Sequence, residues 1–98
     1  MSQILEGRSA IVTGAASPQG LGLASAKMLA EHGARVLITD LDAAAAEAAA
    51  RTLPGRGHFG ARCNVTDKAD CEAAAALAVT HFGRIDVLVN IAGITNPQ

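Results

Sequence analysis

Aromatic side chains are nearly absent from this sequence. Its 98 residues include no tryptophan and no tyrosine, and Phe59 and Phe82 are its two phenylalanines, although 50% of the residues are hydrophobic. A core must therefore be built from alanine, valine, isoleucine and leucine, as in a parallel sheet with closely packed helices. The length allows one domain.

A strong net charge, long apolar runs and clustered cysteines are also lacking. The net charge is −1, and no basic run indicates binding to nucleic acid or to an acidic membrane surface. Neither a membrane span nor a signal peptide is recognisable. Cys63 and Cys71 lack the spacing of a metal or redox motif, so we expect reduced thiols in a cytoplasmic protein rather than a disulfide.

What the chain does contain is a glycine-rich segment, Thr13 to Gly22, between an apolar run and a stretch of helical periodicity. A strand, a glycine-rich turn and a helix N-terminus in this order can hold a phosphate, because the first N–H groups of the helix are unpaired. Gly14 suits the exit from the strand, Gly20 the approach of a pyrophosphate, and Gly22 the packing of the helix on the strand. A kinase-type phosphate loop is excluded, since no Lys-Ser or Lys-Thr pair follows these glycines.

A carboxylate ends the second apolar run, about twenty residues after the glycines. This residue, Asp40, can accept hydrogen bonds from ribose hydroxyls and repel a 2′-phosphate. The pattern indicates a dinucleotide site. The alternative is an aspartate that only caps a turn or a helix.

Periodicity and turn signals predict strands at 9–13, 35–39, 58–63 and 86–90, and helices at 20–31, 43–53 and from after Thr66 to Phe82. The alternation predicts an α/β fold, a Rossmann-type three-layer sandwich with a parallel sheet of order 3-2-1-4, truncated after the fourth strand. The strand at 86–90 would then leave an open apolar edge that favours self-association or docking onto a missing C-terminal half.

Finer expectations concern the helices. We expect Asp42 and Thr66 to cap the second and third helices, and Gly33 and Gly83 to end the first and third. The residues expected to face the sheet are Leu21, Ala24, Met28 and Leu29 in the first helix and Cys71, Ala74, Ala78 and Phe82 in the third. The carboxyl ends of the strands should bring Gly14, Asp40, Asn64 and Asn90 to one rim of the sheet.

Taken together, these motifs resemble the short-chain dehydrogenase/reductase family over nearly the whole chain, residues 5–93. The residues that carry the resemblance are Thr13-Gly14, Gly20-Leu21-Gly22, Asp40, Asn64-Val65 and Asn90-Ile91-Ala92-Gly93.

The resemblance implies an NAD(P)-dependent oxidoreductase that transfers hydride between NAD(H) and an alcohol/carbonyl substrate. Asp40, placed at the adenine ribose, implies that NAD is preferred to NADP. Residues 1–98 would be its NAD-binding Rossmann half-domain, without metal ligands. The implied cofactor-binding residues are Gly14, Ser17, Gln19, Gly20, Leu21 and Gly22 near the pyrophosphate, Asp40, Leu41, Asn64 and Val65 near the adenosine, and Asn90, Ala92 and Gly93 near the nicotinamide ribose.

Several features depart from the family pattern. The glycine-rich turn has five residues, 15–19, where three are usual; Asn64 replaces an aspartate, and Ile91 replaces the second asparagine of an Asn-Asn-Ala-Gly motif. The family's catalytic Tyr-x-x-x-Lys lies downstream of that motif, and this sequence has no tyrosine, so we expect no catalytic residue here and an inactive isolated chain. Two alternatives stay open, a non-catalytic dinucleotide-binding or interaction fragment and a methyltransferase-type domain.

Overall fold

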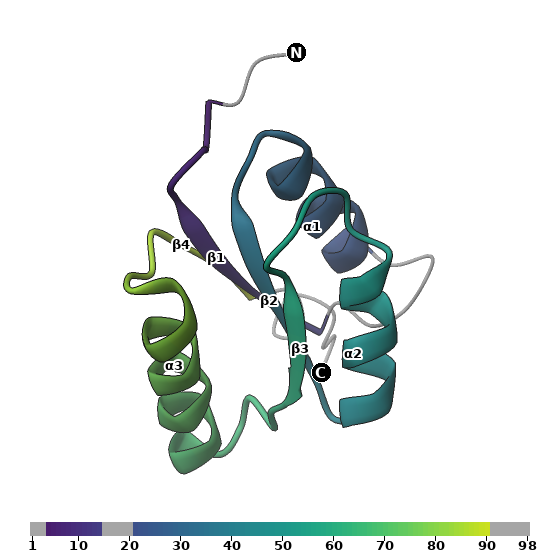
Figure 1. Ribbon diagram of the computed structural model, residues 1–98. Coiled ribbons are helices and arrows are strands. Elements are labelled where there is room, and N and C mark those ends of the chain that lie inside the picture. The colour runs from purple at the N-terminus through teal and green to yellow at the C-terminus, as the bar shows by residue number, and fades with distance from the viewer. Residues whose placement is uncertain (1–3, 15–20, 91–98) are drawn as a thin grey trace.

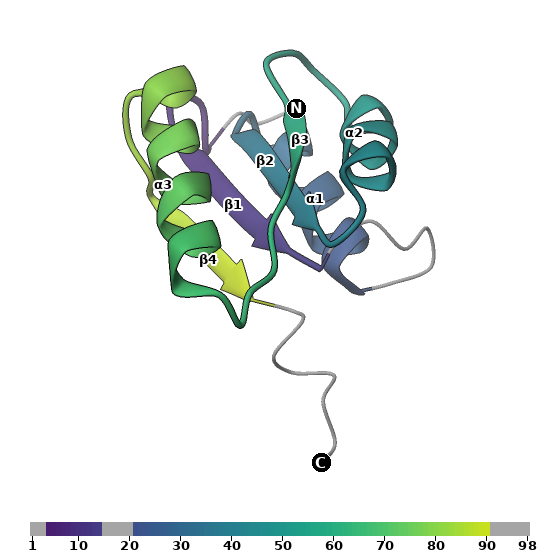
Figure 2. The same ribbon diagram turned by 90° about the horizontal axis from the view of Figure 1, so that it is seen from below.

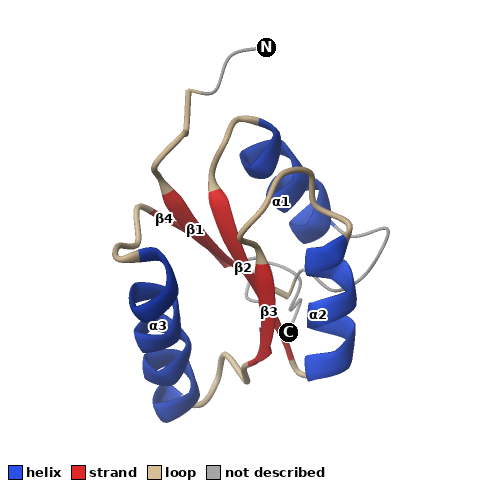
Figure 3. Ribbon diagram, viewed as in Figure 1, coloured by secondary structure: helices blue, strands red, loops and turns tan. Residues whose placement is uncertain are grey.

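A computed structural model describes residues 4–14 and 21–90, in which strands and helices alternate along the chain (Figures 1 and 3). The strands are β1 (Ser9–Thr13), β2 (Arg35–Asp40), β3 (Phe59–Arg62) and β4 (Val87–Asn90), and the helices are α1 (Leu21–Glu31), α2 (Ala43–Arg51) and α3 (Lys68–Phe82). The predictions for Ser17, Gln19, Gly20, Ala92 and Gly93 concern positions outside the described residues.

The strands form one parallel sheet in the order β3-β2-β1-β4, which confirms the predicted order. In this sheet Val12 of β1 pairs with Ile38 of β2 on one side and with Val89 of β4 on the other. Because the strands are parallel, all their carboxyl ends lie at one edge of the sheet, where α/β proteins place ligands.

Helices cover both faces of the sheet, so the predicted three-layer arrangement is confirmed. Figure 2 shows α3 on one face and α1 and α2 on the other. Successive strand residues point to opposite faces. Val12 and Ile38 therefore join the core under α1 and α2, whereas Ile11 and Leu37 pack with Phe82 of α3.

Small residues set the close spacing between α2 and the sheet. The buried face of α2 consists of Ala46, Ala49 and Ala50. A Cβ atom on Gly60 of β3 would overlap the backbone carbonyl of Ala46. The alanine run that looks featureless in the sequence is therefore a packing surface, and a glycine is required opposite it.

The predicted N-cap of α2 and the predicted glycines at the C-terminal ends of α1 and α3 are confirmed. The Asp42 carboxylate accepts hydrogen bonds from the N–H groups of Ala44 and Ala45, at 3.0 and 3.2 Å. Gly33 and Gly83, which follow α1 and α3, have φ angles of 102° and 84°, the left-handed conformation that glycine adopts without strain.

The predicted cap of α3 is wrong by one residue. The N-cap is Asp67, whose Oδ1 accepts hydrogen bonds from the N–H groups of Ala69 and Asp70, at 2.9 and 3.3 Å. The Thr66 hydroxyl instead donates to Oδ1 of Asn64, at 2.7 Å. Thr66 is therefore part of the preceding turn, and the helix begins after Asp67.

The predicted inner face of α1 is also wrong in part. Leu23, Ala26 and Ala30 are buried, while Ala24 and Met28 are exposed. Both rows of residues repeat at helical spacing, so periodicity alone does not choose between them. The structure turns the row with the smaller side chains inward, since these let the helix approach the sheet closely.

For α3 the predicted inner face is largely confirmed. Ala74, Ala78 and Phe82 are buried. Cys71, placed on the same face by its spacing, is exposed, and its thiol donates a hydrogen bond to the carbonyl of Val65, at 3.5 Å.

Candidate cofactor-binding site

A cavity of about 240 Å³ lies at the carboxyl edge of the sheet, where the loops that follow β1, β2 and β3 meet. It unites predicted site residues that are up to 51 positions apart (65 − 14) in the sequence. The residues that line it are Gly14, Asp40, Leu41, Cys63, Asn64, Val65 and Thr66.

Gly14 forms the wall of this cavity at the end of β1. Its N–H donates to the carbonyl of Thr39, at 2.8 Å, and its φ angle is 69°. The hydrogen bond continues the β1–β2 ladder by one residue, and the positive φ then turns the chain out of the sheet. Other residues adopt this conformation at a cost, which explains glycine at the strand exit.

Asp40 stands at the end of β2, where the chain leaves the sheet, and it is half-buried. Its carbonyl accepts the N–H of Cys63, at 2.8 Å, so the backbone of β2 is tied to the segment after β3. The carboxylate is thereby placed in the same cavity as Asn64 and Val65. It can accept hydrogen bonds from the hydroxyls of a ribose bound there.

Asn64 shapes the loop after β3 through its own side chain. Its Oδ1 accepts the N–H of Thr66, at 3.0 Å, as well as the Thr66 hydroxyl. This Asx turn uses the amide oxygen. Hydrogen bonding to a bound base would therefore use the amide nitrogen, a donor that the aspartate more usual in the family does not have.

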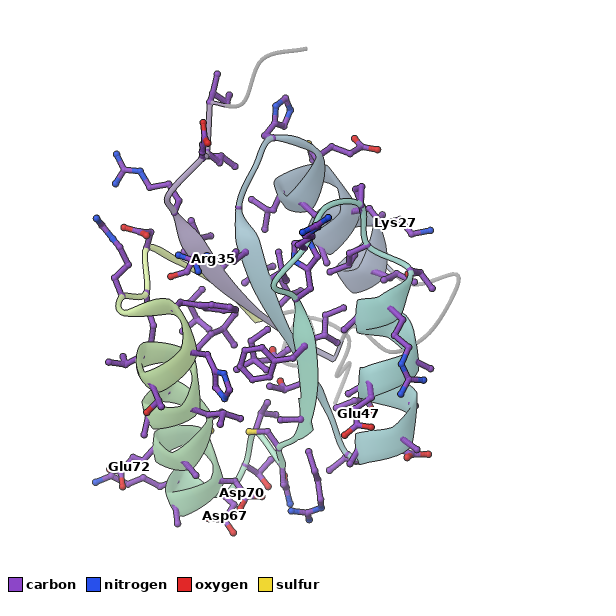
Figure 4. All side chains as sticks on the ribbon, in the orientation of Figure 1. Lys27, Arg35, Glu47, Asp67, Asp70 and Glu72 are labelled. Atoms are coloured by element: carbon purple, nitrogen blue, oxygen red, sulfur yellow. The ribbon has the colours of Figure 1, made fainter. Side chains whose placement is uncertain are left out.

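Asp70 is a structural residue of the site that the sequence analysis missed. Its Oδ2 accepts the backbone N–H of Asn64 and the Arg62 guanidinium, both at 3.0 Å. It thus ties the first turn of α3 to the loop that lines the cavity. The sequence signal for this role was the spacing of Asp67 and Asp70, which lie three residues apart like the ends of a capping box. Figure 4 shows both side chains at the N-terminal end of α3.

The edge of the cavity is acidic. The loops 40–42 and 64–67 contain Asp40, Asp42 and Asp67 and no basic residue. Among residues 4–14 and 21–90, no three potential metal ligands come together, and no helix combines the length and hydrophobicity needed to cross a bilayer. The carboxylates at this edge can accept hydrogen bonds from ligand hydroxyl groups.

On the nicotinamide side of the predicted site, the described residues give backbone positions only. Asn90 pairs with Thr13 in the sheet register, next to the exit of β1, and α1 begins at Leu21. Gly22 is buried in the first turn of α1.

Residues 14–98 match the family model described as Enoyl-(Acyl carrier protein) reductase. An uncharacterized short-chain type dehydrogenase/reductase of Sinorhizobium fredii is 45% identical over 97 residues, and D-threitol dehydrogenase of Mycolicibacterium smegmatis is 51% identical over 92 residues. These alignments cover 96% and 92% of this chain but 38% and 35% of the relatives.

A solved structure shows the same arrangement. Hydroxysteroid dehydrogenase from Escherichia coli superposes with a TM-score of 0.80 at 35% sequence identity, over 90% of this chain and 37% of that protein. The chain therefore spans little more than a third of the length of these three proteins.

Proposed function

Because the chain belongs to the short-chain dehydrogenase/reductase family, we propose that it forms the NAD-binding part of an oxidoreductase. The proposed reaction is hydride transfer between NAD(H) and an alcohol/carbonyl pair. Proteins of this family use NAD(P) cofactors, which supply when bound a nicotinamide that gives or takes the hydride. The contribution of this chain is to bind and orient the cofactor.

The observation that carries the proposal is the shared cavity of Gly14, Asp40, Asn64 and Val65. A glycine at a strand exit lets a ligand approach the backbone, a carboxylate accepts ribose hydroxyls, and an amide and an apolar side chain flank a base. These are the groups that the adenosine half of a dinucleotide needs, and they meet where α/β sheets bind ligands.

Within that proposal, the cofactor is NAD rather than NADP. Asp40 would accept hydrogen bonds from both hydroxyls of the adenine ribose, and a 2′-phosphate in the same place would be repelled by it. Asp42 and Asp67 on the adjoining loops add to the repulsion.

The remaining cofactor contacts are assigned by the family pattern. We propose that Gly14, Gly20 and Leu21, with Ser17 and Gln19 of the same turn, line the pyrophosphate, and that Gly22 packs α1 onto β1. Leu41 would lie beside the adenosine, and Asn90, Ala92 and Gly93 would border the nicotinamide ribose. A cytoplasmic location remains part of the same proposal.

A second candidate function, an interaction fragment, is favoured by the outer edge of β4. Leu88 is 66% exposed, and within the described residues β4 pairs only with β1. An exposed apolar edge strand is a template for pairing with another strand. We propose that this edge docks a second copy of the chain or the remaining part of a longer enzyme.

An NMR titration of the labelled chain with NAD tests the cofactor site directly. We expect the amide signals of Gly14, Leu41, Asn64 and Val65 to shift together in a saturable manner, while that of Gly83, at the opposite end of α3, stays in place. Absence of shifts in a chain with dispersed, folded-state signals would contradict the proposal. Shifts confined to β4 that follow the concentration of the chain and not that of NAD would support the interaction fragment instead.

A further inference from the structure

A second cavity, of about 180 Å³, contains both cysteines of the chain. It lies between α3 and the sheet, and its other lining is mainly apolar, with Ile11, Val65, Ala74 and Leu88 among the residues. Cys63 is also part of the lining of the candidate cofactor cavity. The sequence spacing of the two cysteines matches no redox motif, yet the fold brings them into one cavity.

The backbone holds each cysteine in place. Cys63 follows β3, and its N–H donates to the Asp40 carbonyl at 2.8 Å. Cys71 ends the first turn of α3, where its N–H donates to the carbonyl of Asp67 at 3.1 Å and its thiol to the carbonyl of Val65 at 3.5 Å. Thiols on a strand end and on a capped helix turn are thus held facing the same space.

The two thiols differ in their environment. Cys71 is exposed, whereas Cys63 is buried. Burial, and then the charge and hydrogen bonding of the neighbouring Cys71 thiol, raise the pKa of Cys63 to about 11. Cys63 is therefore protonated at neutral pH, and Cys71 is the thiol that an oxidant in solution reaches first.

We propose that Cys63 and Cys71 form a peroxide-sensitive dithiol site, which is oxidised to an intramolecular disulfide. The Cys71 thiolate attacks one oxygen of a hydroperoxide, the O–O bond breaks, and a sulfenic acid forms with release of water or an alcohol after protonation. The sulfur of Cys63 then attacks the Cys71 sulfur, and the hydroxyl group leaves with the Cys63 proton as water. The peroxide takes up two electrons, and the two thiols lose them.

The disulfide would close a ring over residues 63–71. This ring includes Asn64 and Val65, so oxidation would occur directly beside the candidate adenosine cavity. The dithiol proposal depends on the positions of the two thiols and not on NAD binding. Its test needs no nucleotide, so that a failure of the dithiol proposal and a failure of NAD binding are distinguishable.

The test is treatment of the reduced, purified chain with hydrogen peroxide, followed by intact mass and tryptic mapping. We expect the mass to fall by two hydrogen atoms, both thiols to be lost to alkylation, and the tryptic peptides 63–68 and 69–84 to be linked. The folded chain should form this link faster than the same chain in urea, because the fold holds the thiols together.

Two single substitutions serve as controls, with circular dichroism to verify folding. Cys63→Ser should leave Cys71 to accumulate added oxygen or to form a covalent dimer, and Cys71→Ser should leave buried Cys63 unoxidised. The proposal is overturned if, in the unsubstituted chain, Cys71 gains oxygen while Cys63 stays open to alkylation in urea. It is equally overturned if the folded chain forms the link no faster than the unfolded chain.

Discussion

At the scale of single residues, aspartate carboxylates hold helix starts and loops of this chain in place. Asp42 and Asp67 begin helices, Asp70 holds the loop after β3, and Asp86 fastens the start of β1. The Asp42 cap could be predicted from sequence because its signal is local, whereas at α3 the prediction chose Thr66, the residue before the actual cap. The contacts of Asp70 and Asp86 could not be predicted, since their partners are decided by how distant segments pack.

Asp86 gives a pH-dependent prediction. Its carboxylate accepts the N–H of Ser9 at 2.9 Å and pairs with Arg84 at 2.7 Å and Arg8 at 3.4 Å. The hydrogen bond from the Ser9 N–H lowers the pKa of Asp86, and Arg84 and Arg8 lower it further. Partial desolvation raises the pKa but does not outweigh these contacts. Because the pKa is lower in the folded than in the unfolded state, the contribution to stability is present above the unfolded value of about 3.9 and is lost as the pH falls through the folded value.

Asp86→Asn should therefore lower the urea midpoint of unfolding at neutral pH, and its difference from the unsubstituted chain should shrink in acid. Glu72→Gln removes a charge from an exposed position on α3, which Figure 4 shows on the outer side of that helix, and it should change the midpoint little. An Asp86→Asn effect that is the same at neutral and at acid pH would show that its cause is not the carboxylate charge.

At the scale of elements, the sequence predicts the existence and order of strands and helices better than their orientation. Turn glycines such as Gly33 and Gly83 and the apolar strands mark the boundaries within a few residues. The predicted inner face of α1 was wrong because exposed Met28 and buried Ala26 belong to two rows of residues with the same helical spacing. Choosing between the rows requires knowing how closely the helix approaches the sheet, which is a tertiary property.

The N-terminus of α3 offers a direct test at this scale, since sequence and structure point to adjacent residues. Asp67→Ala removes the acceptor of two helix N–H groups and should reduce the free energy of unfolding by about 1 kcal/mol. Thr66→Ala removes a hydroxyl in the exposed turn before the helix and should cost no more than about 0.5 kcal/mol. Urea unfolding at constant m value measures both, and the reverse ranking would restore Thr66 as the cap.

At the scale of the whole molecule, the β4 edge of the sheet exposes an apolar side chain. The described sheet ends at β4, where Leu88 is exposed on the same face as α3 and lines the cavity beneath it. The strand order, and with it this edge, could be predicted from the alternation of elements and the family resemblance. The convergence of Cys63 and Cys71 could not, because it depends on where the first turn of α3 lies over the end of β3.

The β4 edge predicts association of the purified chain at micromolar concentration, visible in size-exclusion chromatography with light scattering. Leu88→Lys places a charge on the edge strand and should shift the chain toward monomer. Met28→Lys, on the outward face of α1 at 56% exposure, is the matched control and should leave association unchanged. A sharp monomer peak for the unsubstituted chain would contradict self-association through this edge.

The most direct test of the central claim is calorimetric titration of the folded chain with NAD and NADP, repeated with Asp40→Asn. This substitution keeps the shape of the side chain and removes its charge, and Glu72→Gln serves as the control for a distant charge. We predict that the chain binds NAD more tightly than NADP, that Asp40→Asn largely removes the preference, and that Glu72→Gln retains it. Equal affinity for both nucleotides in the unsubstituted chain, or a preference unchanged by Asp40→Asn, would contradict the assignment of this cavity to the adenine ribose of NAD.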